Sequence, residues 1–209
     1  MPGGPRLSAA LDGAEGAGRG VVVCHPHPHH GGTKDAAVVR LIADACAARG
    51  FLVLRFDFRG VGDSGGGDAV GPQAWDDAAA AVDALAERLP PGAPIGVAGY
   101  SFGAWVAAHE AARDDRVGAV ALVCPGASLG GIPMPRDALR GRPALAVAAE
   151  EDHLTPPDEV ARLLAAMGGG RVERVPGADH YLRGHGEDVA ALVAQFLDEA
   201  LPAPAEAAS

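Results

Sequence analysis

The side chain of this sequence best suited to covalent chemistry is the hydroxyl of Ser101, at the centre of a Gly-Tyr-Ser-Phe-Gly pentapeptide. An apolar run at 95–98 precedes the pentapeptide, and a segment of helical composition and spacing follows it. A serine at so sharp a turn from strand to helix stands clear of the sheet, and the flanking glycines leave room for the turn. The pattern therefore predicts that Ser101 is a nucleophile.

A second Gly-x-Ser-x-Gly match is centred on Ser64, and its string also fits the nucleophile motif of chymotrypsin-like proteases. Ser64 lies in a glycine-rich run, and no helical pattern begins before about residue 73. Such a loop has no helix start to fix a nucleophile or to supply oxyanion donors, and a chymotrypsin-like protein would be all-β. We therefore interpret Ser64 as a loop residue.

A nucleophilic serine needs a general base and a carboxylate that orients this base. Asp152 closely follows an apolar run at 143–149, and His180 closely follows another at 171–175. Both lie at the ends of predicted strands, in the order acid then histidine that this arrangement requires after the serine. We predict a triad of Ser101, Asp152 and His180. The competing side chains nearby are Glu150, Glu151 and Asp179 for the acid and His185 for the base.

A histidine-rich loop, His-Pro-His-Pro-His-His-Gly-Gly, follows the apolar run at 20–24. Its histidines lack the i, i+4 spacing of helical zinc sites and its prolines stiffen it, so we predict neither a metal nor a cofactor. Because proline has no N–H, His27 is the natural donor from this loop to an oxyanion, and Phe102 is the second donor. The side chains expected to line the substrate site are those of His29, His30, Tyr100 and Tyr181.

Apolar runs alternate with helical patterns along most of the chain. The expected strands are 20–24, 51–57, 95–98, 117–124, 143–149 and 171–175, and the expected helices are 35–49, 73–89, the one after Ser101, 156–167 and 187–201. This alternation predicts an α/β fold, a doubly wound, mostly parallel sheet with helices on both faces and an antiparallel edge strand at 6–11. We expect one domain at 1–201 and a flexible tail at 202–209. In such sheets ligands bind at the carboxyl ends of the strands, where the candidate residues lie.

These motifs resemble those of the α/β-hydrolase superfamily over about residues 20–200, and most closely those of compact bacterial hydrolases of the dienelactone-hydrolase-like group. The resemblance rests on the loop at 25–32, on a Phe-Arg-Gly-Val-Gly segment at 58–62 and on the serine pentapeptide. It implies the α/β-hydrolase fold. The segment at 125–142 is too short for the cap domain of many relatives, so we expect an open, shallow cleft.

The chain departs from the pattern of this group at three places. His29-His30 stands where an apolar or aromatic pair is usual, and Asp57 stands where Asn is usual. The nucleophile is serine, whereas dienelactone hydrolases proper use cysteine, so their substrate is not implied.

The composition disfavours several function classes. A net charge of −10 argues against nucleic acid or an anionic membrane as a partner. No apolar run is long enough to span a membrane, and residues 1–20 lack the order of a signal peptide. The three cysteines, an odd number in apolar segments, are typical of buried thiols in a reducing cytoplasm, which is the localisation we expect. The oligomeric state is not predicted.

The function that these residues favour is hydrolysis of a small or accessible carboxylic ester through an acyl-Ser101 intermediate, ahead of a thioester or an amide. Two alternatives stay open. A hydrolase-fold protein can bind a ligand in its cleft without catalysis. The residues Gly60-x-Gly62-x-x-Gly65 match a dinucleotide-binding fingerprint, although no helix is expected at the offset that this fingerprint needs.

Overall fold

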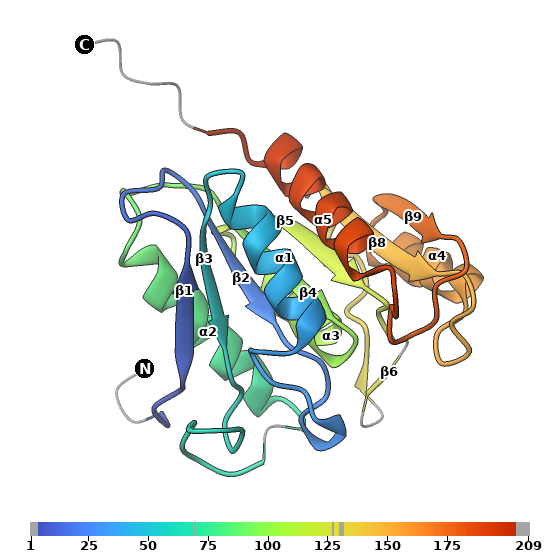
Figure 1. The fold of residues 1–209 in the computed structure, drawn as a ribbon, viewed down its shortest axis with the longest axis horizontal. Coiled ribbons are helices and arrows are strands. Elements are labelled where there is room, and N and C mark those ends of the chain that lie inside the picture. The colour runs from blue at the N-terminus through green and yellow to red at the C-terminus, as the bar shows by residue number, and fades with distance from the viewer. Residues whose placement is uncertain (1–3, 69, 127, 130–131, 204–209) are drawn as a thin grey trace.

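The computed structural model describes residues 4–68, 70–126, 128–129 and 132–203, and a seven-stranded sheet forms its centre (Figure 1). Its strands are β1 (Ala9–Asp12), β2 (Gly20–Cys24), β3 (Leu52–Phe56), β4 (Ile95–Tyr100), β5 (Val117–Val123), β8 (Ala144–Ala149) and β9 (Arg171–Val175). They follow the order β1-β3-β2-β4-β5-β8-β9 across the sheet. β1 pairs antiparallel with β3, and all other neighbours in this sheet are parallel.

Helices cover both faces of the sheet. They are α1 (Ala37–Ala47), α2 (Gln73–Ala86), α3 (Phe102–Arg113), α4 (Pro157–Met167) and α5 (Gly186–Ala200). Figure 1 shows α1 and α5 in front of the sheet, with α2 and α3 behind it. The buried apolar side chains accordingly form two cores, one with α1 and α5 and the other with α2, α3 and α4. This architecture confirms the predicted doubly wound α/β class.

The central strands are buried on both faces, which explains their near-continuous apolar sequences. All five residues of β2 and all six of β8 are buried. Parallel strands covered by helices on both sides have this character, because neither face meets water. For the same reason, the apolar runs locate these strands in the sequence to within one or two residues.

The edge strand is shifted relative to the prediction. It is expected at 6–11, and it pairs with β3 only from Ala9. The preceding residues bond to the loop after β3 instead, since the carbonyl oxygen of Arg6 accepts the N–H of Gly65 and that of Ser8 accepts the N–H of Asp57. Loop contacts therefore replace the ladder at the start of this segment.

The segment between β5 and β8 contains a two-stranded hairpin of β6 (Ser128–Leu129) and β7 (Ile132–Pro133). Its described residues, 124–126, 128–129 and 132–143, form no helix. The expected absence of a cap domain agrees with this short connection. The sequence patterns predict neither the hairpin nor the short 3-10 helix at Pro28–His30.

α5 ends at Ala200, and the last described residue is 203. Most of the tail expected at 202–209 therefore lies outside the described residues. Among the helices that the structure describes, none has the length and apolar character needed to cross a membrane.

Candidate active site

Ser101 occupies a tight turn between β4 and α3. Its backbone has φ 54° and ψ −113°, a conformation that costs strain for a residue other than glycine. The backbone segments around this turn lie very close together. A Cβ at Gly99 would lie 2.1 Å from the carbonyl oxygen of Gly103, and a Cβ at Gly103 would lie 2.1 Å from the carbonyl oxygen of Cys24. The glycines that flank the serine are therefore required by packing. The turn places Ser101 at the carboxyl end of the central strand β4, on the same side of the sheet as the loops that follow the parallel strands β2, β8 and β9.

The three residues of the predicted triad form a hydrogen-bonded chain. Ser101 Oγ lies 3.1 Å from His180 Nε2, and His180 Nδ1 lies 2.7 Å from Asp152 Oδ2. Both distances are those of hydrogen bonds. Each side chain comes from a different loop, after β4, β8 and β9. The structure thus brings together the serine, the acid and the histidine in the relation that nucleophilic activation requires.

Further contacts hold the acid and the histidine in place. The other carboxylate oxygen of Asp152 accepts the N–H groups of Leu154 and Thr155 at 2.8 and 2.9 Å, and its side chain is fully buried. The hydroxyl of Tyr100 donates to the carbonyl oxygen of His180 at 2.7 Å. Both residues are thus fixed by contacts that leave the bonds of the triad free to form.

Cys124 lies beside the triad, and its sulfur is within 4.8 Å of ligand atoms of Asp152 and His180. In the described part of the chain, this is the one group of three such side chains close enough to hold a metal ion. Burial, and secondarily the Asp152 carboxylate, raises the pKa of the Cys124 thiol to about 12, so the thiol stays protonated and is a poor ligand. Two members of the group are also already bonded to each other. The chemistry of this group therefore fits a triad better than a metal site.

Phe102 and His27, the two residues expected to donate to an oxyanion, both lie close to Ser101. Phe102 is the first residue of α3, so its N–H has no acceptor within the helix. His27 lines the same cleft as Ser101, and its ring centroid lies 5.2 Å from that of Phe102. Within the residues that the structure describes, the N–H of His27 donates no hydrogen bond. The two expected donor residues thus contact each other through their rings beside the cleft.

The histidines of the loop after β2 have different surroundings. His25 is fully buried, with Nδ1 2.6 Å from the Pro26 carbonyl oxygen and Nε2 accepting the N–H of Phe58 at 3.1 Å. Burial lowers the pKa of His25 to about 4, so this ring is neutral and structural. His29 pairs with Asp68, at 2.8 Å between Nε2 and Oδ2.

The cleft at Ser101 has a volume of about 590 Å³. Of the four side chains expected to line it, those of His30, Tyr100 and Tyr181 do so. His29 instead lines a neighbouring hollow of about 570 Å³ that contains Asp68. Among the lining residues that the sequence patterns did not single out are Leu154, Thr155 and Glu159. Their signal was position alone, directly after the acid and in the first turn of α4.

Two exposed side chains with apolar surface lie at the mouth of the cleft, and the cleft lining includes an acidic residue but no lysine or arginine in the described part of the chain. Leu154 and Tyr181, from the loops that carry the acid and the histidine, are 67% and 58% exposed. Outside the triad, Glu159 is the acidic residue among the lining residues, and no lysine or arginine lines the described cleft.

Ser64 has a structural role. Its hydroxyl accepts the N–H of Ser8 at 2.8 Å and donates to the carbonyl oxygen of Asp57 at 2.7 Å. The next helix, α2, begins only at Gln73. The glycine loop around Ser64 therefore has neither a free nucleophile nor the adjoining helix start that a dinucleotide fingerprint needs.

Comparison with known proteins places the chain in a family. A family model described as serine aminopeptidase, S33, matches residues 19–140, which include Ser101 and end before Asp152 and His180. An uncharacterised protein of Rickettsia prowazekii is 29% identical over 191 residues, covering 84% of this chain and 77% of the relative.

Solved structures extend the likeness over nearly the whole chain. A putative α/β hydrolase from Agrobacterium tumefaciens is 26% identical with a TM-score of 0.79, and the match covers 97% of both chains. A structure from Xanthomonas campestris, described as a serine hydrolase without a lid, is 24% identical with a TM-score of 0.80 and covers 98% of this chain and 99% of its own. The second likeness concerns the fold alone.

Proposed function

Because the chain belongs to the serine aminopeptidase S33 family, within the α/β-hydrolase superfamily, we propose that it is a serine hydrolase that cleaves a small or accessible carboxylic ester. The observation that carries this proposal is the hydrogen-bonded chain from Ser101 through His180 to Asp152. The family is described as a serine aminopeptidase, whereas the ester substrate is inferred from the dimensions and lining of the cleft.

In the first half of the reaction, Ser101 Oγ attacks the carbonyl carbon of the ester while His180 Nε2 takes the hydroxyl proton. Asp152 holds the imidazole with Nδ1 protonated and stabilises the imidazolium ion. The N–H groups of Phe102 and His27 donate to the oxyanion of the tetrahedral intermediate. Collapse of the intermediate breaks the bond to the alcohol, which leaves with the proton from His180.

In the second half, water replaces the alcohol. His180 takes a proton from water, and the resulting hydroxide attacks the carbonyl carbon of the acyl-Ser101 ester. Collapse returns the proton to Ser101 Oγ and releases the carboxylic acid. The described residues of the segment at 125–142 form no helix that could cap the cleft, so both the substrate and this water can reach Ser101.

The dimensions and the rim of the cleft favour small acyl groups. A cleft of about 590 Å³ is within the range of small-molecule sites, and the exposed side chains of Leu154 and Tyr181 offer an apolar contact at its mouth. A small-molecule ester is therefore the partner that we propose. Cys24, Cys46 and Cys124 are free and buried, which supports the reducing cytoplasm as the proposed compartment.

Hydrolysis of p-nitrophenyl esters of graded acyl length tests the proposal. We expect turnover to be highest for short acyl chains and to be abolished in Ser101→Ala. Ser64→Ala is the matched control, since it removes the other serine with the same local motif; it should still turn over these esters, although loss of its hydrogen bond to Asp57 can lower the rate. Equal activity of Ser101→Ala and the wild type would overturn the assignment. Folded wild-type protein that turns over none of these esters would favour a ligand-binding function instead.

A further inference from the structure

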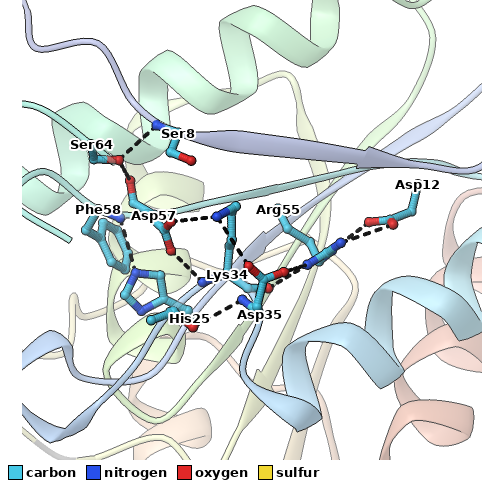
Figure 2. Close-up of polar contacts among 10 residues, drawn as sticks. Ser8, Asp12, His25, Lys34, Asp35, Arg55, Asp57, Phe58 and Ser64 are labelled. Atoms are coloured by element: carbon cyan, nitrogen blue, oxygen red, sulfur yellow. Dashed lines mark hydrogen bonds and ion pairs between the residues drawn. The ribbon is translucent and has the colours of Figure 1, made fainter. Parts of the chain in front are cut away.

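The loop that carries His27 is anchored at both ends to the residues that follow β3 (Figure 2). At its start, the Nε2 atom of His25 accepts the N–H of Phe58 at 3.1 Å. At its end, Lys34 bonds to the carboxylate of Asp57, the residue before Phe58. The two anchors after β3 are thus consecutive residues, while the loop between them spans residues 25–34.

Lys34 is held by three of its groups. Its backbone N–H and its Nζ donate to the two carboxylate oxygens of Asp57, at 2.7 and 2.8 Å. Its carbonyl oxygen accepts a hydrogen bond from Arg55 at 2.8 Å, and Arg55 also binds Asp12 on β1 and Asp35 (Figure 2). Hydrogen bonding to Asp57 raises the pKa of Lys34, so the ion pair is maintained throughout the neutral range. Both the backbone and the side chain of this residue are therefore immobilised against the end of β3.

Asp57 is itself rigid. It is 2% exposed, its N–H donates to the carbonyl oxygen of Ser8, and its own carbonyl oxygen accepts the hydroxyl of Ser64. The structural role of Ser64 is thus part of this support. Because the Asp57 backbone is fixed and its buried carboxylate accepts two hydrogen bonds from Lys34, Asp57 holds Lys34 in one position.

The anchor at Lys34 is transmitted to His27 through a short, closed turn. The carbonyl oxygen of His27 accepts the N–H groups of His30 and Gly32, at 3.0 and 3.1 Å. Gly32 packs so closely against the start of the loop that a Cβ there would lie 1.9 Å from the Pro26 carbonyl oxygen. Only residue 33 separates this closed turn from Lys34. A displacement of Lys34 therefore moves the peptide that carries the His27 N–H.

We infer that Asp57 is a positioning residue for catalysis, which fixes the oxyanion-binding N–H of His27 through its bonds to Lys34. The inference rests on the proposed function. Donors to an oxyanion act only when they are fixed at hydrogen-bond distance from the developing charge, and small misplacements cost large factors in rate. The loss of Asp57 is consequently a loss of transition-state stabilisation and leaves substrate binding nearly unchanged.

The test compares Asp57→Ala, Asp57→Asn and the wild type with a p-nitrophenyl ester. We expect kcat to fall about 30- to 100-fold in Asp57→Ala, less than the roughly 10²- to 10³-fold cost of removing one oxyanion donor because the N–H is displaced and not lost, with KM changed less than about twofold. Asn keeps an acceptor for the Lys34 N–H and loses the ion pair, so Asp57→Asn should fall about 3- to 10-fold. The inhibition constant of a trifluoromethyl ketone, which forms a hemiketal oxyanion on the serine, should rise by the same factor as kcat/KM falls.

Asp77 offers a matched control. It is also 2% exposed, and it accepts both the backbone N–H and the guanidinium of Arg59, whose side chain is as exposed as that of Lys34. Its side-chain hydrogen bonds within the described residues all go to Arg59, and none goes to the loop at 25–34. Asp77→Ala should therefore lower the melting temperature as Asp57→Ala does, with kcat within about twofold of the wild type.

The outcomes separate this inference from the proposed function. Wild-type protein without esterase activity refutes the proposed function itself. An active wild type with equal kcat losses in Asp57→Ala and Asp77→Ala, or with a loss that appears in KM alone, overturns the positioning role. If Asp57→Ala does not fold, Asp57→Asn and Lys34→Met replace it. Lys34→Met leaves the backbone bond and should lose about 3- to 10-fold in kcat, with Lys34→Arg restoring most of it.

Discussion

Replacement of Glu110 by glutamine is expected to stabilise the protein above neutral pH and to leave it unchanged in acid. Glu110 lies on α3, is 1% exposed, and has an Oε2 atom without a hydrogen-bond partner in the described part of the chain. Burial raises the pKa of this carboxyl group from 4.5 to about 7. The folded protein therefore holds the proton more tightly than the unfolded chain does.

The sign and the size of the effect follow from this pKa. A raised carboxyl pKa contributes stability that is fully present below pH 4.5 and is lost as the pH rises through about 7. Each unit of difference between the folded and the unfolded pKa is worth about 1.4 kcal/mol. The shift from 4.5 to about 7 therefore lowers the free energy of unfolding by about 3 kcal/mol at pH 8.5. Glutamine has nearly the same shape and carries no charge at any pH, so Glu110→Gln does not suffer this loss.

The assay is urea unfolding of both proteins at pH values from 4.5 to 8.5. Subtraction of the wild-type free energy of unfolding from that of Glu110→Gln cancels the other titrating groups. We expect the difference to rise by about 3 kcal/mol over this range, with a midpoint near pH 6. Glu87→Gln, at an exposed position after α2, is the control and should show no trend. A difference for Glu110→Gln that is flat with pH would refute the reasoning.

Three further predictions concern the site. Asp152→Asn should lower kcat by about 10³- to 10⁴-fold, because an amide cannot hold His180 in the required tautomer, and KM for a p-nitrophenyl ester should change little. Gly103→Ala should yield unfolded or strongly destabilised protein by circular dichroism, since its Cβ would lie 2.1 Å from the Cys24 carbonyl oxygen; a native melting temperature would contradict this. Glu159→Gln should raise kcat/KM about fivefold for an ester with a carboxylate in its acyl group, relative to a neutral ester of equal size, because about 1 kcal/mol of repulsion is removed. An unchanged ratio would mean that Glu159 does not face the acyl group.

The fold and the triad could be predicted from two local patterns, the apolar runs of the strands and the polar residues that follow them. Buried parallel strands are continuous apolar runs, and the carboxyl ends of such strands meet at one edge of the sheet. Strand order and strand ends alone therefore predict that Asp152 and His180 lie near Ser101. The structure sets these three side chains at hydrogen-bond distances, and their catalytic roles stay a proposal until activity is measured.

The contact between Lys34 and Asp57, which anchors the loop at 25–34, could not be predicted in the same way. Lys34 and Asp57 are 23 residues apart, and their contact depends on how two loops pack at neighbouring strands. Likewise, nothing in the spacing of the histidines distinguishes buried His25, bonded to Phe58, from His29, paired with Asp68. Local periodicity encodes elements and strand ends, whereas partners between loops are set by tertiary packing.

The central claim is that Ser101 is the nucleophile, and covalent labelling tests it most directly. Wild-type protein is treated with a fluorophosphonate, and the adduct is located by mass spectrometry of its peptides. We expect one adduct per chain, on Ser101, which disappears in Ser101→Ala and persists in Ser64→Ala. An adduct on another residue, or labelling that survives Ser101→Ala, would contradict it.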